Sequence, residues 1–170
     1  MTVQEQQHIF KQWLYMYKAL IFKIVRAYGS TAMDHDDLFQ EISIQVWNSI
    51  PTFRHESAVT TWIYRIALNT AIRWVSKEQK YRNTNGTMES IPDILFQQNI
   101  QADEQLTWLY KAIHQLDEID RSVALLLLDG FSYKEMATIL GITVSNVGVK
   151  INRIKKQLII QSKKFNKNGI

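Results

Sequence analysis

The fold is decided by Ser132-Tyr-Lys-Glu-Met-Ala-Thr-Ile-Leu-Gly-Ile-Thr-Val-Ser-Asn-Val-Gly-Val-Lys-Ile-Asn-Arg-Ile-Lys-Lys-Gln-Leu158, a stretch that predicts two short helices around one tight turn. Ser132 and Glu135 have the spacing of a capping box at the start of the first helix. Ala137 is small enough for a helix crossing, and Gly141 can adopt the positive φ that the turn needs. The stretch therefore predicts a helix-turn-helix, with Val147 packing the second helix against the first.

The second helix of this motif has two chemically different faces. On a helical wheel one narrow arc is apolar, and the opposite side is polar and basic. The apolar arc holds Val147, Ile151, Ile154 and Leu158, and the polar side holds Asn146, Lys150, Arg153 and Gln157. One face can pack against the first helix while the other enters a major groove, so the motif predicts sequence-specific DNA binding. The alternative is an ordinary amphipathic hairpin whose basic face is only solvated.

Charge is distributed unevenly along the chain, which has a net charge of +4. Residues 131–170 contain eight basic residues and one acidic residue, whereas residues 91–130 contain two basic and seven acidic residues. A basic block that coincides with a helix-turn-helix is typical of phosphate binding, because each neutralised phosphate releases condensed counterions. A disordered basic tail would explain only residues 163–170.

Length and composition limit the class of protein. A chain of 170 residues allows one ordinary domain or two small ones, and we expect two. The absence of cysteine excludes disulfides and thiolate zinc sites. Near the N-terminus, basic residues interrupt every apolar run before it reaches the roughly 18 residues that a membrane span needs. The sequence therefore predicts a cytoplasmic protein with no stable membrane insertion.

Apolar residues recur at helical spacing along the chain, and no strand-like alternation is long enough to build a sheet. Helices are expected over about 4–28, 34–50 and 59–80, followed by a polar, turn-rich stretch that indicates a linker. The sequence thus predicts an all-α fold of two small helical domains joined by a flexible linker. The domains are expected over residues 1–82 and 102–170, and the linker over residues 83–101.

The helix expected over residues 59–80 carries cations around an aromatic ring. On a helical wheel five polar residues lie within about 120° of each other, with Trp62 among them; these are Arg65, Asn69, Arg73, Lys77 and Lys80. Such a surface suits single-stranded DNA, because phosphates follow the positive charge and an unstacked base can lie against the indole. In the alternative interpretation, which the residues alone slightly favour, Trp62 caps the hydrophobic core and arginine stems lie over it.

Three further stretches carry a resemblance to a known family. They are Asp36-Asp-Leu-Phe-Gln-Glu-Ile-Ser-Ile-Gln-Val-Trp-Asn-Ser-Ile50, Phe53-Arg-His-Glu-Ser57 and Thr61-Trp-Ile-Tyr-Arg-Ile-Ala-Leu-Asn-Thr-Ala71. These stretches resemble region 2 of the extracytoplasmic-function (group IV, sigma-70 family) sigma factors of bacterial RNA polymerase, and the helix-turn-helix resembles region 4. The resemblance covers nearly the whole chain in the right order. It implies a protein without enzymatic activity or cofactor that lends promoter specificity to core polymerase.

The resemblance also implies roles for individual residues of region 2. The helix that docks on the coiled coil of the polymerase β′ subunit is matched by Asp37, Leu38, Gln40, Glu41, Gln45 and Trp47, with Leu38 and Trp47 expected at the interface. In the alternative interpretation both are plain core residues, because helical periodicity also places Leu38 in an apolar stripe with Ile42, Val46 and Ile50. The part that opens and reads the minus-ten element, where a base is flipped into a protein pocket, is matched by Trp62, Arg65, Asn69, Arg73 and Lys77. Asn69 is the strongest candidate, because its amide can both donate to and accept from a base edge.

In region 4 the resemblance assigns the surface that lies on the minus-thirty-five element. The matching residues are Ser145, Asn146, Val149, Lys150, Arg153 and Lys156. We expect Lys150 to contact a base edge and Arg153 to contact a phosphate. Gly148 departs from the commonest family pattern, which has a basic residue there, so the promoter sequence is left open. The family further implies contact with the polymerase β flap and control by an anti-sigma factor, which is often membrane-bound.

Two other classes of protein are compatible with parts of the sequence. A DNA-binding response regulator has a similar C-terminal helix-turn-helix, but it needs an upstream α/β receiver, and residues 1–90 contain no buried strands. A helical metal-dependent hydrolase could bind magnesium through clustered carboxylates; the candidates are Asp34, Asp36, Asp37 and Glu41. Such sites usually draw ligands from facing helices as well, whereas the remaining acidic residues of this region are scattered.

Overall fold

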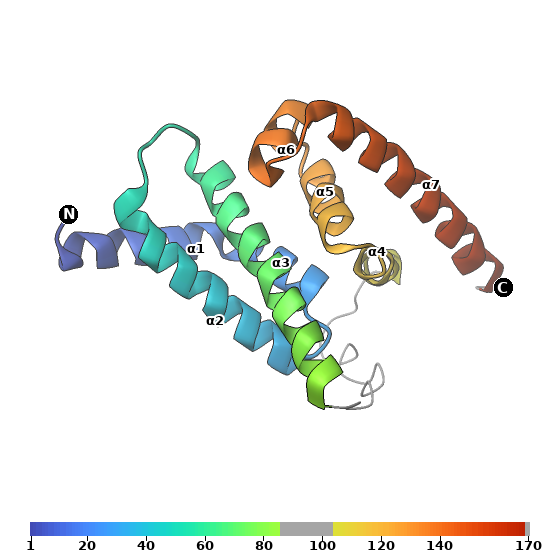
Figure 1. Ribbon diagram of the computed structural model, residues 1–170, viewed down its shortest axis with the longest axis horizontal. Helices are drawn as coiled ribbons and strands as arrows, with labels where there is room; N and C mark the ends of the chain where they lie inside the picture. Colours follow the sequence, from blue (N-terminus) through green and yellow to red (C-terminus); the bar gives the residue numbers. More distant parts are fainter. Residues whose placement is uncertain (86–103, 169–170) are drawn as a thin grey trace. The chain divides into compact units, whose positions relative to one another are not determined.

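The computed structural model describes residues 1–85 and 104–168. Within these ranges the chain forms seven α-helices, one short 3-10 helix and no strand, so the predicted all-α fold is confirmed. None of the helices in this described part combines the length and apolarity that a membrane crossing requires. The chain divides into two compact units, Met1–Gln98 and Asn99–Ile170 (Figure 1).

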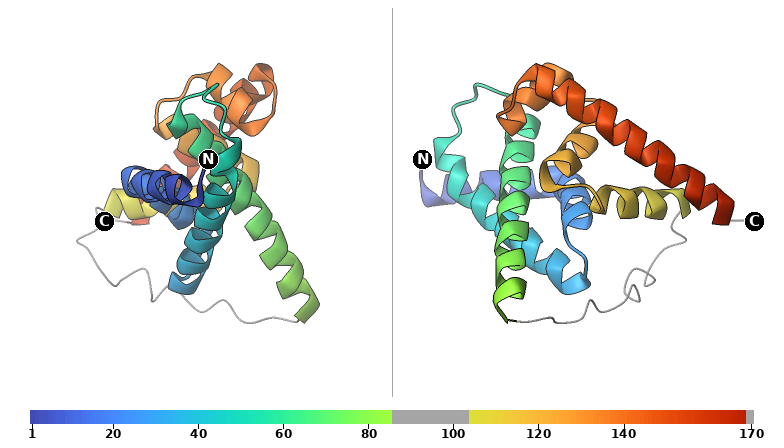
Figure 2. Two further views of the ribbon diagram at one scale, coloured as in Figure 1. Left: turned by 90° about the vertical axis from the view of Figure 1, so that its left-hand side faces the viewer. Right: turned by 45° about the vertical axis from the view of Figure 1, so that its right-hand side comes forward.

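The first unit is a three-helix domain. It contains α1 (Val3–Tyr28), α2 (Ala32–Ser49), the 3-10 helix η1 (Ile50–Thr52) and α3 (Val59–Asn85). Each of the three long helices packs against the other two, as Figure 1 and both views of Figure 2 show. Every helix contributes one apolar stripe to the core, and the fully buried side chains include Ile21, Ile24, Leu38, Ile42, Ile63 and Leu68.

Local sequence signals set the ends of α1 and α2. Thr2 and Thr31 cap these helices, and each forms a capping box with the acidic residue three positions later. Gly29 ends α1 with a φ of −85°, which any residue can adopt. A Cβ at Gly29 would lie only 2.6 Å from the ring of His35. The glycine is therefore needed for the close approach of the turn between α1 and α2, and not for an unusual φ.

α3 is longer than the sequence predicted. It continues past the expected end at residue 80 to Asn85. The polar residues here had indicated a linker, but the Thr84 hydroxyl donates to the backbone oxygen of Lys80 at 2.8 Å. A threonine that bonds back one turn satisfies its hydroxyl without leaving the helix. Residues 83–85 of the predicted linker are therefore helical, and residues 86–101 lie outside the described residues.

The second unit contains four helices. They are α4 (Glu104–His114), α5 (Glu118–Leu128), α6 (Tyr133–Leu140) and α7 (Val144–Asn168). α7 packs against the other three, and the buried residues of α5 supply much of the core (Figures 1 and 2). Arg121 fastens the α4–α5 connection, because its Nη2 donates to the backbone oxygens of His114 (2.7 Å) and Leu116 (3.0 Å).

α6 and α7 form the helix-turn-helix that the sequence predicted. The Ser132 hydroxyl accepts from the backbone N–H of Glu135, and the Glu135 carboxylate accepts from that of Ser132, which confirms the capping box. The hydrogen bonds from the Ser132 side chain and backbone lower the pKa of Glu135. Gly141 adopts a φ of 67°, and Val147 is fully buried, as the turn and the helix contact require.

Two glycines of this motif should respond in opposite ways to alanine. Gly141→Ala puts a Cβ into open space but keeps a left-handed backbone, so we expect a loss of about 1–2 kcal/mol of stability. Gly148→Ala, inside α7, puts its Cβ in ordinary contact 3.8 Å from Tyr133 Cε2. Because glycine weakens a helix interior, this change should add about 0.5–1 kcal/mol. Urea unfolding followed by circular dichroism would measure both, and a shift of the same sign for the two variants would contradict the prediction.

Candidate nucleic-acid interface

Two adjacent grooves follow the line where α2 meets α3, and together we call them the α2–α3 groove. The first, of about 360 Å³, is lined by Gln45, Ser49, Ile66, Asn69, Ile72 and Arg73. The second, of about 250 Å³, is lined from α2 by Asp37, Glu41 and Gln45, and from α3 chiefly by Arg73, Trp74 and Lys77. Gln45 and Arg73 line both parts, so the two are neighbours.

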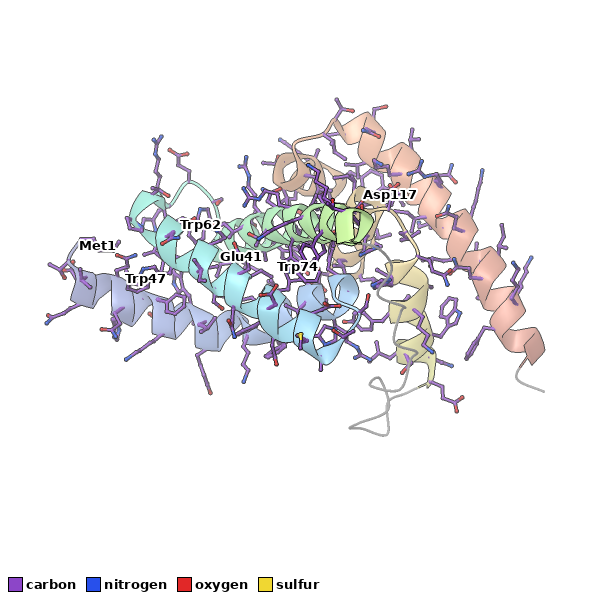
Figure 3. All side chains as sticks on the ribbon, turned by 60° about the horizontal axis from the view of Figure 1, so that its bottom comes forward. Met1, Glu41, Trp47, Trp62, Trp74 and Asp117 are labelled. Carbon is purple, nitrogen blue, oxygen red and sulfur yellow. The ribbon has the colours of Figure 1, made fainter. Side chains whose placement is uncertain are left out.

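The α2–α3 groove brings together residues to which the sequence assigned two different roles. Asp37, Glu41 and Gln45 were predicted to bind polymerase, whereas Asn69, Arg73 and Lys77 were predicted to bind the minus-ten element. Carboxylates from α2 and cations from α3 line one part of it. Figure 3 labels Glu41 on α2 and Trp74 on α3. The two predicted surfaces are therefore contiguous along one helix pair.

Asn69 is exposed on α3 and forms part of the groove wall. Its neighbours in the lining are polar residues of α2, Gln45 and Ser49, and apolar residues of its own helix, Ile66 and Ile72. An amide beside apolar side chains can form hydrogen bonds with the edge of a base while the ring of the base lies on the apolar surface. Arg73 in the same lining is exposed and can hold a phosphate.

A hydrogen bond fastens the two helices beside the groove. Trp74 Nε1 donates to Asp37 Oδ2 at 2.6 Å, and the indole itself is only 8% exposed. Asp37 therefore already has a structural partner on α3. A contact between Asp37 and polymerase would have to use its other carboxylate oxygen or break this bond.

Trp62 lies outside the α2–α3 groove, in a cluster of aromatic rings. Its ring centroid is 4.9 Å from that of Phe53 and 5.4 Å from that of Trp13, and it is half-buried (Figure 3). The ring of His55, a residue with a left-handed φ of 58°, contacts Phe53. These contacts give Trp62 a packing role, and its contact with the minus-ten element stays a prediction. Sequence analysis missed Trp13 and Phe53 as its partners, because they lie on other segments.

The structure corrects the predicted docking edge on α2. Leu38 is 0% exposed and lies in the core stripe of α2, so the prediction that it contacts polymerase is wrong. Trp47 is half-buried, and its ring packs edge-to-face on Phe10 with centroids 5.4 Å apart (Figure 3). Gln40 and Glu41 are exposed, as a docking edge requires.

Ile44 is an exposed apolar residue of α2 that sequence analysis missed. Its side chain is 52% exposed, and it lies about one helical turn from both Gln40 and Trp47. The available signal was its position outside the core stripe, since an isoleucine there has no place in the interior. Such a residue between polar neighbours has the composition of a small protein-binding surface.

The first turns of α7 present small side chains to solvent. Ser145, Asn146 and Val149 are exposed, and Lys156 is exposed two turns further along the helix. The Thr143 hydroxyl accepts from the backbone N–H of Asn146 at 3.1 Å, which caps the helix start. Hydroxyl, amide and methyl groups at a helix N-terminus are suited to contacts with base edges in a major groove.

Lys150 is not on the exposed face of α7, contrary to the prediction. Its side chain is only 16% exposed, and its Nζ donates to Asp120 Oδ1 at 2.8 Å. Arg153 is half-exposed but also pairs with Asp120, and its Nη2 lies 3.3 Å from Asp117 Oδ2. The helical wheel placed both cations correctly on the polar side. The first turn of α5 covers that side, which no local pattern shows.

The acidic residues of α2 do not assemble a metal centre. Over the residues described here, no group of three or more His, Cys, Asp or Glu side chains is placed to hold an ion. Asp34 accepts from the backbone N–H groups of Ser30 and Thr31, and Asp37 accepts from Trp74. Two of the four candidate carboxylates therefore hold the fold together, and the hydrolase alternative gains no support.

Two protein-family models match the chain in succession. Residues 13–81 match sigma-70 region 2, and residues 106–158 match sigma-70 region 4. Together they cover well over half of the chain and fall on its two units. The fold and these matches define an RNA polymerase sigma factor of the sigma-70 class, a transcription initiation factor that directs the polymerase to promoters.

Similar proteins narrow this class. The sigma-E factor of Escherichia coli K12, an ECF sigma factor, is 27% identical over 165 residues, which is 89% of this chain and 85% of the relative. The Haemophilus influenzae sigma-E factor is 28% identical over 137 residues, 74% of this chain and 72% of the relative. The chain belongs to the extracytoplasmic-function sigma factors, which confirms the predicted family and its function as an alternative sigma factor.

Solved structures share the fold. The sigma factor RpoE of Bartonella quintana, crystallised with the anti-sigma factor NepR, has a TM-score of 0.73 at 22% identity and covers 91% of this chain and 96% of its own. CnrH, solved in complex with the cytosolic domain of CnrY, has a TM-score of 0.65 at 22% identity; the match covers 93% of this chain and 90% of CnrH.

Proposed function

We propose that the two units engage core polymerase and promoter DNA through three surfaces. The exposed edge of α2 around Glu41 and Ile44 binds the coiled coil of the β′ subunit. The α2–α3 groove receives an unpaired base of the minus-ten element at Asn69. The start of α7 reads the minus-thirty-five element, and the second unit also contacts the β flap. The chain performs no chemistry itself and acts in the cytoplasm with the polymerase that it guides.

One observation carries the minus-ten assignment: the Asn69 amide and the Arg73 guanidinium line one groove together with apolar side chains. A base that leaves the duplex loses stacking and pairing partners, and this groove offers replacements for both. Exposed Arg65 and Lys77 lie on the same helix and extend the positive charge along a single strand. This arrangement attracts phosphates without sequence preference, while Asn69 offers a base-specific contact.

The α2 edge has the composition expected for docking on a basic helical hairpin. Ile44 supplies exposed apolar area, and Glu41 and Gln40 lie one turn away on the same side. An apolar centre with acidic and amide neighbours combines desolvation with charge complementarity. The surface thus fits a basic partner, which the Glu41 carboxylate would attract.

Reconstituted transcription is the experiment that tests the whole proposal. Core polymerase with and without the purified chain would be supplied with a genomic promoter library. We expect transcripts that depend on the chain and share minus-ten and minus-thirty-five sequences. A chain that binds DNA but starts no transcripts would instead be a helix-turn-helix regulator, the alternative that the sequence left open.

Ile44→Ala should weaken binding to core polymerase by about tenfold or more, as truncation of a desolvated apolar contact does. Because the side chain is already half-exposed in the free protein, the helix content and melting temperature should stay unchanged. Titration of fluorescently labelled full-length chain with core polymerase would measure the affinity.

Met33→Ala is the matched control for Ile44→Ala. Met33 is 81% exposed on the same helix but lies near its N-terminus, away from the proposed edge. It should leave the affinity for core polymerase unchanged. Equal affinities for the wild type and both variants would remove Ile44 from the interface.

Regulation by an anti-sigma factor belongs to the same proposal. The structural relative RpoE was solved with the anti-sigma factor NepR. A partner of that kind would hold this chain inactive by covering the α2 edge. It would then compete with core polymerase, and Ile44→Ala would weaken both complexes.

A further inference from the structure

One buried carboxylate in the second unit holds two cations of the recognition helix α7. Asp120, in the first turn of α5, is 2% exposed. One of its oxygens accepts from Lys150 Nζ at 2.8 Å, and the other pairs with Arg153 Nη2. Asp117, which caps α5, adds a second and more exposed partner for Arg153 at 3.3 Å. The cluster thus joins α5 to the middle of α7.

The charges of this cluster are largely neutralised within the protein. A buried carboxylate is stable only when it is paired, so Asp120 keeps both cations close. Lys150 has little access to solvent. Arg153 is half-exposed, and its pKa is raised, mainly by its hydrogen bond to Asp120. A cation that is already paired cannot release counterions from DNA as a free one does.

The remaining cations near the cluster behave differently. Lys155 and Lys156 follow Arg153 on α7, both are exposed, and the described residues show no ion pair for either. The helix start, with Ser145, Asn146 and Val149, carries no charge at all. α7 therefore has uncharged groups at the end that enters a groove, paired cations in its middle and free lysines beyond them.

We propose that Asp120 is a specificity-determining residue of this sigma factor. It pairs with Lys150 and Arg153 as a phosphate would, and it thereby weakens the binding of the recognition helix to DNA that lacks the specific sequence. The inference rests on the proposed function only in that α7 meets DNA. With two fewer free cations, non-specific affinity falls, while contacts of the helix start with base edges are unaffected. The ratio of specific to non-specific binding rises as a result.

Asp120→Asn in the full-length chain tests this inference, because the amide keeps the shape of the side chain and removes its charge. The probe is a 30-base-pair duplex of random sequence, titrated at several salt concentrations. We expect tighter binding, with the slope of log K against log salt steeper by about 0.9 for each cation that reaches a phosphate. A purely structural ion pair would lower the melting temperature and leave this slope unchanged, which would overturn the inference.

Two further variants keep the test decisive if Asp120→Asn folds poorly. Lys150→Met retains most of the stem and leaves Asp120 paired with Arg153, so the slope should stay at the wild-type value. Lys156→Met removes a free cation and should reduce the slope by about 0.9. An equal reduction of the salt slope in the two lysine variants would overturn the inference. Glu104→Gln, which removes an exposed charge from α4, is the control for net charge and should change nothing.

The same titrations separate this inference from the proposed function. A second duplex would be one enriched from a random library by the wild-type chain bound to core polymerase. If the wild type does not prefer that duplex over random sequence, the proposed reading of the minus-thirty-five element fails, whatever Asp120→Asn does. If the wild type discriminates and Asp120→Asn discriminates equally well with an unchanged slope, the proposed function stands and the role of Asp120 is rejected.

Discussion

Asn69→Ala should reduce promoter opening by about 10- to 100-fold, which corresponds to the roughly 1–3 kcal/mol carried by a good base-specific contact. The side chain is exposed and lines the α2–α3 groove beside Arg73, so its loss removes the amide without disturbing the core. Binding to core polymerase should not change, because the proposed docking edge lies on α2. Permanganate footprinting of a duplex promoter would measure the opening.

A template with a pre-melted bubble isolates the step that fails. If Asn69 stabilises the flipped base, the variant should form a weaker complex than the wild type on both the duplex and the bubble template. On the bubble it should also lose its selectivity for the minus-ten sequence. Ser76→Ala is the control on the same helix, since the Ser76 hydroxyl is exposed and bonds only back to the Ile72 carbonyl. Equal opening by the wild type and Asn69→Ala would reject the assignment of this groove.

Leu38→Ala should strongly destabilise the first unit, because it removes a completely buried side chain from the contact of α2 with α1 and α3. Leucine-to-alanine changes in cores cost about 2–5 kcal/mol. A domain has only about 5–15 kcal/mol of stability in total. Each kcal/mol lowers the melting temperature by about 4–8 °C in a domain of this size. Thermal melting followed by circular dichroism would show the effect.

The comparison with Ile44→Ala gives this prediction its diagnostic value. Both residues are large, aliphatic and on α2, but Leu38 is 0% exposed and Ile44 is 52% exposed. Leu38→Ala should lower the melting temperature, and it should weaken binding to core polymerase only as a consequence of unfolding. Ile44→Ala should weaken binding to core polymerase with no change in the melting temperature. A normal melting temperature for Leu38→Ala with lost affinity would restore the docking role that the sequence predicted.

The successes of sequence analysis lie where neighbouring residues interact. The capping box of Ser132 with Glu135 and the C-cap at the left-handed Gly141 involve groups three or four positions apart, so the order of residues alone defines them. The burial of Val147, Ile151 and Ile154 followed from helical periodicity, because one apolar stripe leaves the helix only one way to pack. The predicted family rested on the same kind of local pattern, repeated in the right order.

The errors share one physical cause. Leu38 and Ile44 are both apolar residues of one helix. Periodicity places Leu38 in the core stripe and Ile44 outside it, but the family resemblance suggested docking by Leu38, and the packing of α1 and α3 shows that it is covered. Lys150 lies on the polar side of α7, and its exposure depends on Asp120, which is 30 positions away in the chain. The acidic and basic segments on either side of residue 130 were visible as a charge pattern. Their pairing across α5 and α7 was not.

The sequence by itself determined the all-α fold, the helix-turn-helix and the family, because these follow from periodicity, caps and turn residues that act over short distances. Only the tertiary structure decided which polar and apolar residues remain available to partners. It brought Gln45, Asn69 and Arg73 into one groove, and it withdrew Leu38 into the core and Lys150 into an ion pair. The reason is that exposure is set by what packs against a helix, and the packing partner comes from a distant part of the chain.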